Sequence, residues 1–536
     1  MTIATVRSPR LARGVGTGRL VRLALRRDRV FVAVWFVVLL GVSFASSATA
    51  TGSLYPDEAA RVRAATTIDA SPGIVALYGP ILDLHSTGEL AMTKMTVLYS
   101  VFVAIMLLFV VRRHTRLDEE NGQAELLGGA AIARDAPLAA AVVVGFGLSL
   151  LLGVLVALVN VLGGLPVAGS VAFGGVWAGT GLVATGLTAA ACQLSASART
   201  CAAITSAAIG VLFVLRAVGD TTAATWLSWL TPFGWNTQVR AYGDTRWWLL
   251  LAYVALALAL VAAAHALSVR RDLGSGILAA RPGPATGSPR LADALTLAFR
   301  VHVPMLVGWT AAMATLGVVF GAISPSFSGL DSPGIEDMLR RLGGAGALQD
   351  TLLGAVVSVL SVVVTCFAVA VVGHGGSDEH DGRTEQVLAT ATSRARAFLA
   401  TLLLGIAGAT WLLLVSGVAL AVGVGGDTNH SPWRPVASAL AQAPAVWTVA
   451  SLAVLCFAWR SQWAPLGWGV VVLFTTLGEI GALLELPQWV LDLSPYAHAP
   501  RMPLEDFAPV PALLLTVLAA GLLAVSWLRY RSRDIG

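Results

Sequence analysis

Residues 138–162 read LAAAVVVGFGLSLLLGVLVALVNVL, a run of 25 residues without one charged side chain. A helix needs about 20 apolar residues to cross the hydrocarbon core of a bilayer. Similar runs recur along the chain, which has 536 residues, of which 56% are hydrophobic and only 12% charged. A soluble domain carries about 25% charged residues, and a membrane β-barrel shows alternating rather than continuous apolar runs. The sequence therefore predicts an all-α polytopic membrane protein.

Twelve runs are long enough to be transmembrane helices, six in each half of the chain. The first run follows several arginines but continues as a full span, so we expect an uncleaved anchor rather than a signal peptide. The predicted spans lie near residues 30–48, 97–113, 138–162, 171–194, 201–219, 247–269, 303–323, 352–373, 397–424, 436–458, 464–485 and 509–529.

The distribution of charge predicts the topology, because short basic segments stay cytoplasmic. The tail before the first span, the linker 270–302 and the C-terminus are rich in arginine, whereas the loop 49–96 has more acids than bases. We expect both termini and the linker to be cytoplasmic. The net charge of +5 is explained by this topology and by contact with anionic lipid headgroups, so no nucleic-acid partner is expected.

The chain contains an internal repeat whose unit is about half of its length. Residues 118–127 (DEENGQAELL) and then Arg134 match residues 378–387 (DEHDGRTEQV) and then Arg394, which follow 260 residues later (118 to 378). Three further matches occur in the same order, namely 23–26 with 297–300 (offset 274), 230–233 with 493–496 (offset 263) and 271–274 with 533–536 (offset 262). The sequence therefore predicts two parallel pseudo-repeats of six spans, residues 1–280 and 281–536.

The chain resembles the fused type-2 ATP-binding cassette exporter permeases of actinobacteria, which are described as polyketide-antibiotic (tetronasin-like) or multidrug efflux permeases. The resemblance rests on the segment around Gly122, the LTPFGW stretch at 230–235 and the fused double-six arrangement, and it covers the whole chain. It implies an amphipathic helix before the first span, a coupling helix after the second and a short re-entrant helix pair before the sixth. It also implies a place in the bacterial cytoplasmic membrane.

The function that this resemblance implies is that of a permease subunit of an efflux pump. It would export hydrophobic or amphipathic drugs or polyketides, and two copies of a separate ATPase would bind ATP and Mg. We expect no cofactor or metal on this chain and no enzymatic activity of its own. Lys94 is the one lysine and lies outside any phosphate-binding glycine pattern, so the chain cannot form a P-loop.

Contact with the ATPase is expected at two segments, 116–136 and 378–396, which we call the first and second acidic segments. The candidate coupling residues are Glu119, Glu120, Gly122, Glu125, Arg134, Glu379, Gly382, Glu385 and Arg394. A solvated helix surface is the alternative interpretation. His374, Asp378, Glu379, His380 and Asp381 also suggest metal ligands, but we prefer to interpret them as polar caps on a cytoplasmic helix.

The resemblance places the substrate cavity along the second, fifth, eighth and eleventh spans. The candidate lining residues are Tyr99, Phe102, Phe213, Thr365, Phe367 and Phe474, for which packing against another helix is the alternative. At the 263-residue offset, Arg216 of the fifth span aligns with Glu479 of the eleventh. A charge inside a span needs a partner, so we predict an Arg216–Glu479 ion pair that gates the external side. The alternative is that Arg216 reaches headgroups beside Asp220.

Two other functions fit the composition. A proton-coupled secondary multidrug exporter would need acids within its spans, for which Glu479 and Glu485 are the candidates. An ATP-driven lipid exporter would share the expected architecture and differ in its cargo.

Overall fold

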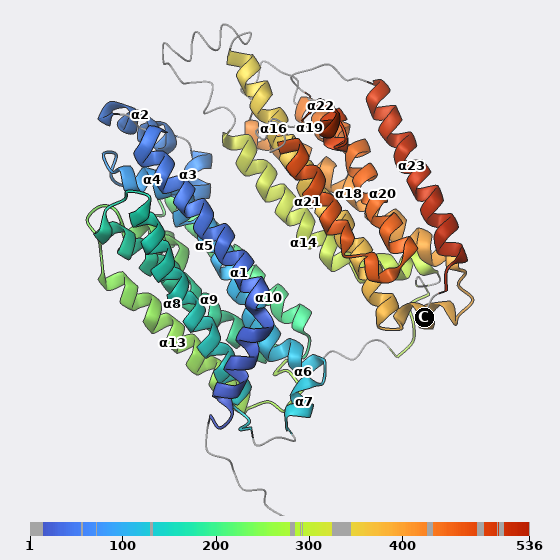
Figure 1. The fold of residues 1–536 in the computed structure, drawn as a ribbon, viewed down its shortest axis with the longest axis horizontal. Helices are drawn as coiled ribbons and strands as arrows, with labels where there is room; N and C mark the ends of the chain where they lie inside the picture. Colours follow the sequence, from blue (N-terminus) through green and yellow to red (C-terminus); the bar gives the residue numbers. More distant parts are fainter. Residues whose placement is uncertain are drawn as a thin grey trace, which may run out of the picture. The chain divides into compact units, whose positions relative to one another are not determined.

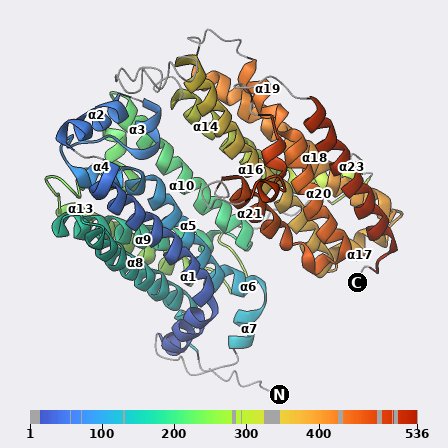
Figure 2. The ribbon, with the colours of Figure 1, turned by 45° about the horizontal axis from the view of Figure 1, so that its top comes forward.

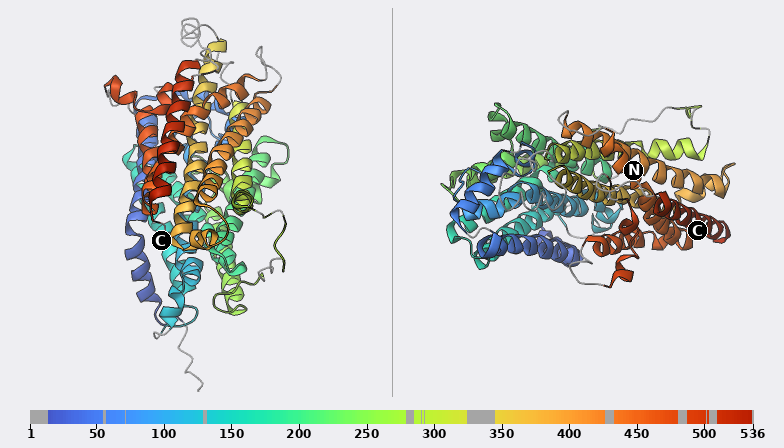
Figure 3. Two further views of the ribbon diagram at one scale, coloured as in Figure 1. Left: turned by 90° about the vertical axis from the view of Figure 1, so that its right-hand side faces the viewer. Right: turned by 90° about the horizontal axis from the view of Figure 1, so that it is seen from above.

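The computed structural model describes residues 14–54, 57–70, 72–128, 132–278, 285–289, 291, 293–323, 345–425, 433–479, 487–500, 502 and 509–534. These residues form helices and connections, with no strand among them, which confirms the all-α prediction (Figure 1). The chain divides into two compact units, Met1–Gly283 and Pro284–Gly536. In each unit the long helices run side by side along one direction (Figures 2 and 3).

The first unit contains six helices that are long and apolar enough to cross a membrane, and α9 packs against four of the others. Its elements are α1 (Thr17–Thr49), η1 (Ala50–Leu54), α2 (Glu58–Asp69), α3 (Pro72–Tyr78), α4 (Thr87–Thr96), α5 (Leu98–Arg112), η2 (Arg113–Leu117), α6 (Asp118–Glu120), α7 (Gln123–Gly128), α8 (Ala136–Leu162), α9 (Val167–Leu194), α10 (Ala198–Thr221), α11 (Trp226–Trp229), α12 (Pro232–Gln238) and α13 (Trp248–Val269).

The described part of the second unit contains five helices that are long and apolar enough to cross a membrane. Its elements are α14 (Ala294–Ile323), α16 (Ala345–His380), α17 (Arg383–Leu388), α18 (Arg394–Val424), α19 (Arg434–Ala441), α20 (Ala443–Trp459), η4 (Ser461–Trp463), α21 (Leu466–Glu479), α22 (Gln488–Leu491), η5 (Pro495–His498) and α23 (Pro509–Ser532).

Eleven helices in the described part of the chain are long and apolar enough to cross a membrane, which fits the predicted polytopic protein. The predicted span 464–485 corresponds to α21, whose last residue is Glu479. Residues 480–486, with Glu485, lie outside the described residues. Residues 324–344, between α14 and α16, lie there as well.

Close contact between α8 and α9 depends on two facing glycines. A Cβ atom built on Gly153 would lie 2.5 Å from the carbonyl oxygen of Gly174, and one built on Gly174 would lie 2.3 Å from that of Gly153. Small residues allow membrane helices to approach closely, and the close approach gains van der Waals contact. Around this crossing, Phe173 and Trp177 are buried in the core of the first unit.

The N-terminal amphipathic segment is not a separate helix. Residues from Thr17 onward continue without a break into the first span as α1, because no helix-breaking residue separates the arginine-rich turns from the apolar ones. The expected pair of short helices before the sixth span is present as α11 and α12.

The first inter-span loop folds into a lobe made of α2, α3 and α4. Asp57 and Ser86 cap the N-termini of α2 and α4 with their side-chain oxygens. The Glu89 carboxylate accepts hydrogen bonds from the backbone amides of Leu82 and Asp83, at 2.6 and 3.0 Å. Burial of Glu89 raises the pKa of this carboxyl above its usual value, since desolvation outweighs the two amide hydrogen bonds.

Candidate functional site

Both acidic segments turn at a glycine in the left-handed region of backbone conformation. Gly122, between α6 and α7, has φ +71°, and Gly382, between α16 and α17, has φ +69°. Glycine adopts this conformation without the steric cost that other residues carry. The repeated glycine of the sequence therefore marks the same turn in both units.

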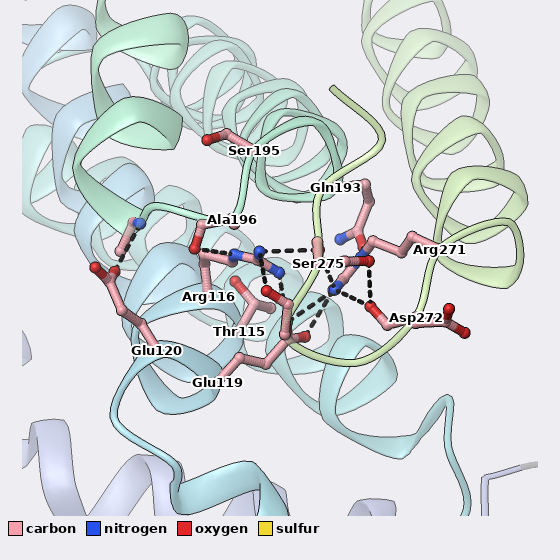
Figure 4. A network of polar contacts seen from close by, with 12 residues as sticks. Thr115, Arg116, Glu119, Glu120, Gln193, Ser195, Ala196, Arg271, Asp272 and Ser275 are labelled. Atoms are coloured by element: carbon pink, nitrogen blue, oxygen red, sulfur yellow. Dashed lines mark hydrogen bonds and ion pairs between the residues drawn. The ribbon is translucent and has the colours of Figure 1, made fainter. Parts of the chain in front are cut away.

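Glu119 is the centre of a buried ionic network in the first unit (Figure 4). Its carboxylate accepts hydrogen bonds from Arg271 Nη1 and Nη2, at 2.8 and 2.6 Å, and from Arg116 Nη1 at 2.5 Å. Arg116 is 1% exposed and also donates to the carbonyls of Ala196 and Ser275. Two-pronged arginine–carboxylate contacts of this kind are strong and orient both partners.

The second unit contains the equivalent ion pair. Glu379 pairs with Arg533, and both side chains are at most 8% exposed. Arg394 donates to the Arg533 carbonyl at 2.8 Å, just as Arg134 donates to that of Arg271. We call the pairs Glu119–Arg271 and Glu379–Arg533 the Glu–Arg clamps.

Each clamp joins the end of one long helix to the end of another. In the first unit it connects α6, which continues from α5, with the residues that follow α13. In the second unit it ties α16 to the residues after α23. The repeat seen in the sequence therefore extends to side-chain contacts between residues more than 150 positions apart, at separations of 152 and 154.

The two units differ in how the start of the acidic segment is held. In the first, Arg27 of α1 pairs with Asp118 at 2.8 Å. In the second, Asp378 pairs with Arg383 of its own segment at 2.7 Å. An ion pair thus connects the first acidic segment to α1, whereas the ion pair of the second acidic segment lies within that segment.

A second difference lies one helical turn earlier. Buried Asp28 contacts Arg113 and His114, at 2.7 and 2.5 Å. The equivalent of Asp28 at offset 274 is His302, and the equivalent of His114 at offset 260 is His374. These two histidine rings pack edge to face, with centroids 5.6 Å apart.

The predicted coupling residues differ in their contacts within the chain. Glu120 accepts a hydrogen bond from the Ala198 amide at the start of α10, at 2.8 Å. Glu125 and Glu385 are exposed, and Leu126 beside Glu125 is 84% exposed. An exposed leucine beside an exposed acid is a surface that a partner protein can cover. The coupling role of all nine residues stays a prediction.

Sequence reasoning missed Arg116, Arg271 and Arg533 as site residues. A signal was available for two of them, since Arg271 and Arg533 begin one of the four repeat matches. Arg116 has Gly376 at the equivalent position of the second half, so no repeat pointed to it.

The six predicted lining residues have different environments. Thr365 and Phe367 are buried; Thr365 shares a hydrogen bond with Tyr496 at 2.7 Å, and Phe367 packs against Trp309. The other four are half-buried or exposed, namely Tyr99, Phe102, Phe213 and Phe474. Contact of these residues with a substrate stays a prediction.

Arg216 is fully buried in α10 and has several partners in its own unit. It donates to the carbonyls of Val75 and Ala76, at 3.2 and 2.7 Å, and pairs with Asp220 at 3.1 Å. The charge of Arg216 is therefore compensated by the lobe of α2, α3 and α4 and by its own helix. The side chain of Glu479 lies outside the described residues, so the Arg216–Glu479 gate stays a prediction.

Within the described ranges, no three His, Cys, Asp or Glu side chains are placed to hold a metal ion.

Two comparisons with known proteins identify the family. The model of the "Multidrug efflux system permease Rv1217c, C-terminal domain" matches residues 291–531. The multidrug efflux system permease protein Rv1217c of Mycobacterium tuberculosis (strain ATCC 25618 / H37Rv) is 38% identical over 536 residues, which cover 99% of this chain and 97% of that protein. Similarity at this level over both whole chains, together with the all-helical polytopic fold, shows that the chain belongs to the family of the multidrug efflux permease Rv1217c.

Proposed function

We propose that this chain is the membrane permease of an ATP-driven efflux pump that exports hydrophobic or amphipathic compounds, such as drugs or polyketides. Two copies of a separate ATPase would bind ATP and Mg and would dock on the two acidic segments. Both termini and the linker would then face the cytoplasm of a bacterial cell. The multidrug efflux name of the relative supports the type of cargo.

The observation that carries the proposal is the duplicated Glu–Arg clamp. Two docking sites require one mechanical connection each, and Glu119–Arg271 and Glu379–Arg533 supply one in each unit. A push on an acidic segment reaches the ends of the second and sixth helices of that unit together, because the clamp holds them. Packed helices joined in this way move as a body, as alternating access requires.

Glu125 and Glu385 are the residues best placed to contact the ATPase, because both are exposed and follow the glycine turns. The carboxylates of Glu119 and Glu379 are already paired within the chain. The paired glutamates therefore transmit the movement, and the exposed ones receive it.

Charge reversal tests this division. The variants Glu125→Arg and Glu385→Arg should each abolish drug efflux and permease-stimulated ATP hydrolysis while the chain still reaches the membrane. Asp244→Arg, an exposed reversal in the connection before α13, is the matched control and should leave both activities unchanged. The wild-type complex should contain two ATPases per permease by native mass spectrometry. Full activity in both acidic-segment variants would refute docking at these segments.

A further inference from the structure

A long apolar groove runs along α14 and α18 of the second unit. Its volume is about 1190 Å³, which slightly exceeds the range of about 300–1000 Å³ for small-molecule sites. The walls are almost entirely aliphatic or aromatic, and polar groups occur mainly at the end near the start of α14. The lining residues used below are Arg300, Thr310, Ala314, Ala407, Gly408 and Trp411.

At three positions of the groove the residue is smaller than its counterpart in the first half. At the repeat offsets, Thr310 and Ala314 correspond to Phe36 and Leu40 of the first half (offset 274). Gly408 likewise corresponds to Leu148 (offset 260). The first unit therefore places bulkier side chains at these equivalent positions. These three differences leave space on the face of α14 and α18 that the groove occupies in the second unit.

The repeat offsets used here agree with contacts between the helices. In the second unit a Cβ atom on Gly321 of α14 would lie 2.9 Å from the Cα of Gly423. In the first unit a Cβ atom on Gly163, the equivalent of Gly423, would lie 1.9 Å from Ser47, the equivalent of Gly321. The same positions meet in both units, so the comparison of groove residues is valid.

One end of the groove carries a positive charge. Arg300 is exposed and forms no ion pair with any residue that the structure describes. It lies three residues before the predicted span 303–323, at the level expected for lipid headgroups. The nearby Asp293 is bonded to Thr296, from whose amide it accepts a hydrogen bond at 2.8 Å, and Arg396 lies close enough to offset its charge.

The rest of the groove offers no free hydrogen-bonding group to a polar ligand. Trp411 Nε1 donates to Thr310 Oγ1 at 3.1 Å, so these two polar groups satisfy each other. From Arg300 to Ala314 the lining extends for about 21 Å of helix. The hydrocarbon of one leaflet is about 15 Å thick, half of the bilayer core. A charged end followed by an apolar channel of this length matches a phospholipid.

We propose that this groove binds one anionic phospholipid, with its phosphate on Arg300 and its acyl chains along α14 and α18 as far as Ala314. An arginine at the membrane surface attracts anionic headgroups over neutral ones. The aliphatic walls and the face of Trp411 bind the chains without a polar group to desolvate. The site is distinct from the acidic segments, and it does not depend on ATP-driven transport.

The test uses the full chain in nanodiscs of phosphatidylcholine and phosphatidylglycerol with a trace of photoactivatable phosphatidylglycerol. Mass spectrometry of the digested protein locates the label. Wild type should be labelled within residues 295–314 and 403–411, and Arg300→Gln should lower that labelling about fivefold. Ala314→Leu and Ala407→Leu, which fill the groove independently, should lower it as well. Arg26→Gln, at the equivalent position of the first unit, is the control and should have no effect.

Three results would overturn the proposal. One is labelling that Arg300→Gln leaves unchanged, and another is equal labelling by a photoactivatable phosphatidylcholine. The third is labelling of the groove by a photoactivatable exported drug and not by phosphatidylglycerol, which would make the groove a cargo site. Efflux by the Arg300→Gln variant, measured in parallel, separates failure of the lipid site from failure of the transport function.

Discussion

Glu119 accepts two hydrogen bonds from the guanidinium of Arg271, and Glu379 forms the equivalent ion pair with Arg533. In each unit the contact joins helices that are far apart in sequence at the level of the acidic segment. The first clamp also holds Arg116, which the second lacks. This difference makes the two clamps unequal in energy, although both join equivalent helix ends.

Neutralising the first clamp should cost more stability than neutralising the second. Glu119→Gln leaves two buried guanidinium groups without their carboxylate, and a broken buried ion pair costs about 3–5 kcal/mol. Glu379→Gln leaves only the Arg533 guanidinium without its carboxylate. The melting temperature of this variant in detergent should therefore fall less than that of Glu119→Gln. Glu125→Gln, an exposed change in the same segment, is the control and should be neutral. Equal losses for the two clamp variants would contradict the role of Arg116.

The contact between α8 and α9 predicts that replacing glycine by alanine has opposite effects on stability at two positions of α8. Gly153→Ala brings a methyl group against the Gly174 carbonyl and should destabilise the protein by about 1–3 kcal/mol. Gly147→Ala, on the same helix but facing open space, should gain about 0.5–1 kcal/mol from reduced backbone freedom in the unfolded state. Thermal unfolding of both variants measures the difference, and a loss in both would show that the close approach is not the cause.

The lobe of α2, α3 and α4 should become less stable as the pH rises. The pKa of Glu89 is raised above its usual value by burial, so the lobe favours the protonated carboxyl. This contribution is complete below the unfolded pKa near 4.5 and is lost as the pH rises through the higher folded pKa. The protection of residues 57–96 against hydrogen exchange, relative to the intrinsic exchange rate at each pH, should therefore decrease as the pH rises in that interval.

Glu89→Gln isolates this effect, because glutamine does not titrate and other acids of the lobe are unchanged. The difference in exchange between wild type and Glu89→Gln should vary with pH above 4.5. A difference that stays constant with pH would show that Glu89 does not control the lobe.

Arg216 should connect α10 to the lobe of α2, α3 and α4, whether or not this arginine also gates transport. Asp220→Asn removes its ion pair and should lower stability by about 1.5–3 kcal/mol, the value of a hydrogen bond to a charged group. The gate prediction has a separate test, in which Arg216→Glu and Glu479→Arg each abolish efflux and the double variant restores it. Failure of the double variant to restore efflux would leave Asp220 and the lobe as the functional partners of Arg216.

Much of this architecture can be read from the sequence because the signals are long or repeated. Apolar runs of about 20 residues define the spans, and the offsets near 260 correctly relate Glu119 to Glu379 and Arg271 to Arg533. The partner of Arg216 could not be predicted in full, since backbone carbonyls such as that of Ala76 carry no sequence signal.

The unbroken helix α1 and the ion pair of Glu119 show a second limit of prediction from the sequence. An arginine-rich turn followed by apolar residues has the same pattern whether the helix bends or continues. An exposed glutamate and a paired one also look alike in sequence, because the pairing arginine is 152 residues away. Packing between distant segments decides both cases.

The most direct test of the account is export of a fluorescent drug in proteoliposomes that contain the chain with its ATPase and an internal pH buffer. We predict export that requires ATP and the second protein, that vanadate abolishes, and that a protonophore leaves unchanged. The chain alone should neither hydrolyse ATP nor export the drug. Export by the chain alone, driven by a pH gradient and abolished by the protonophore, would contradict the account and identify a secondary exporter.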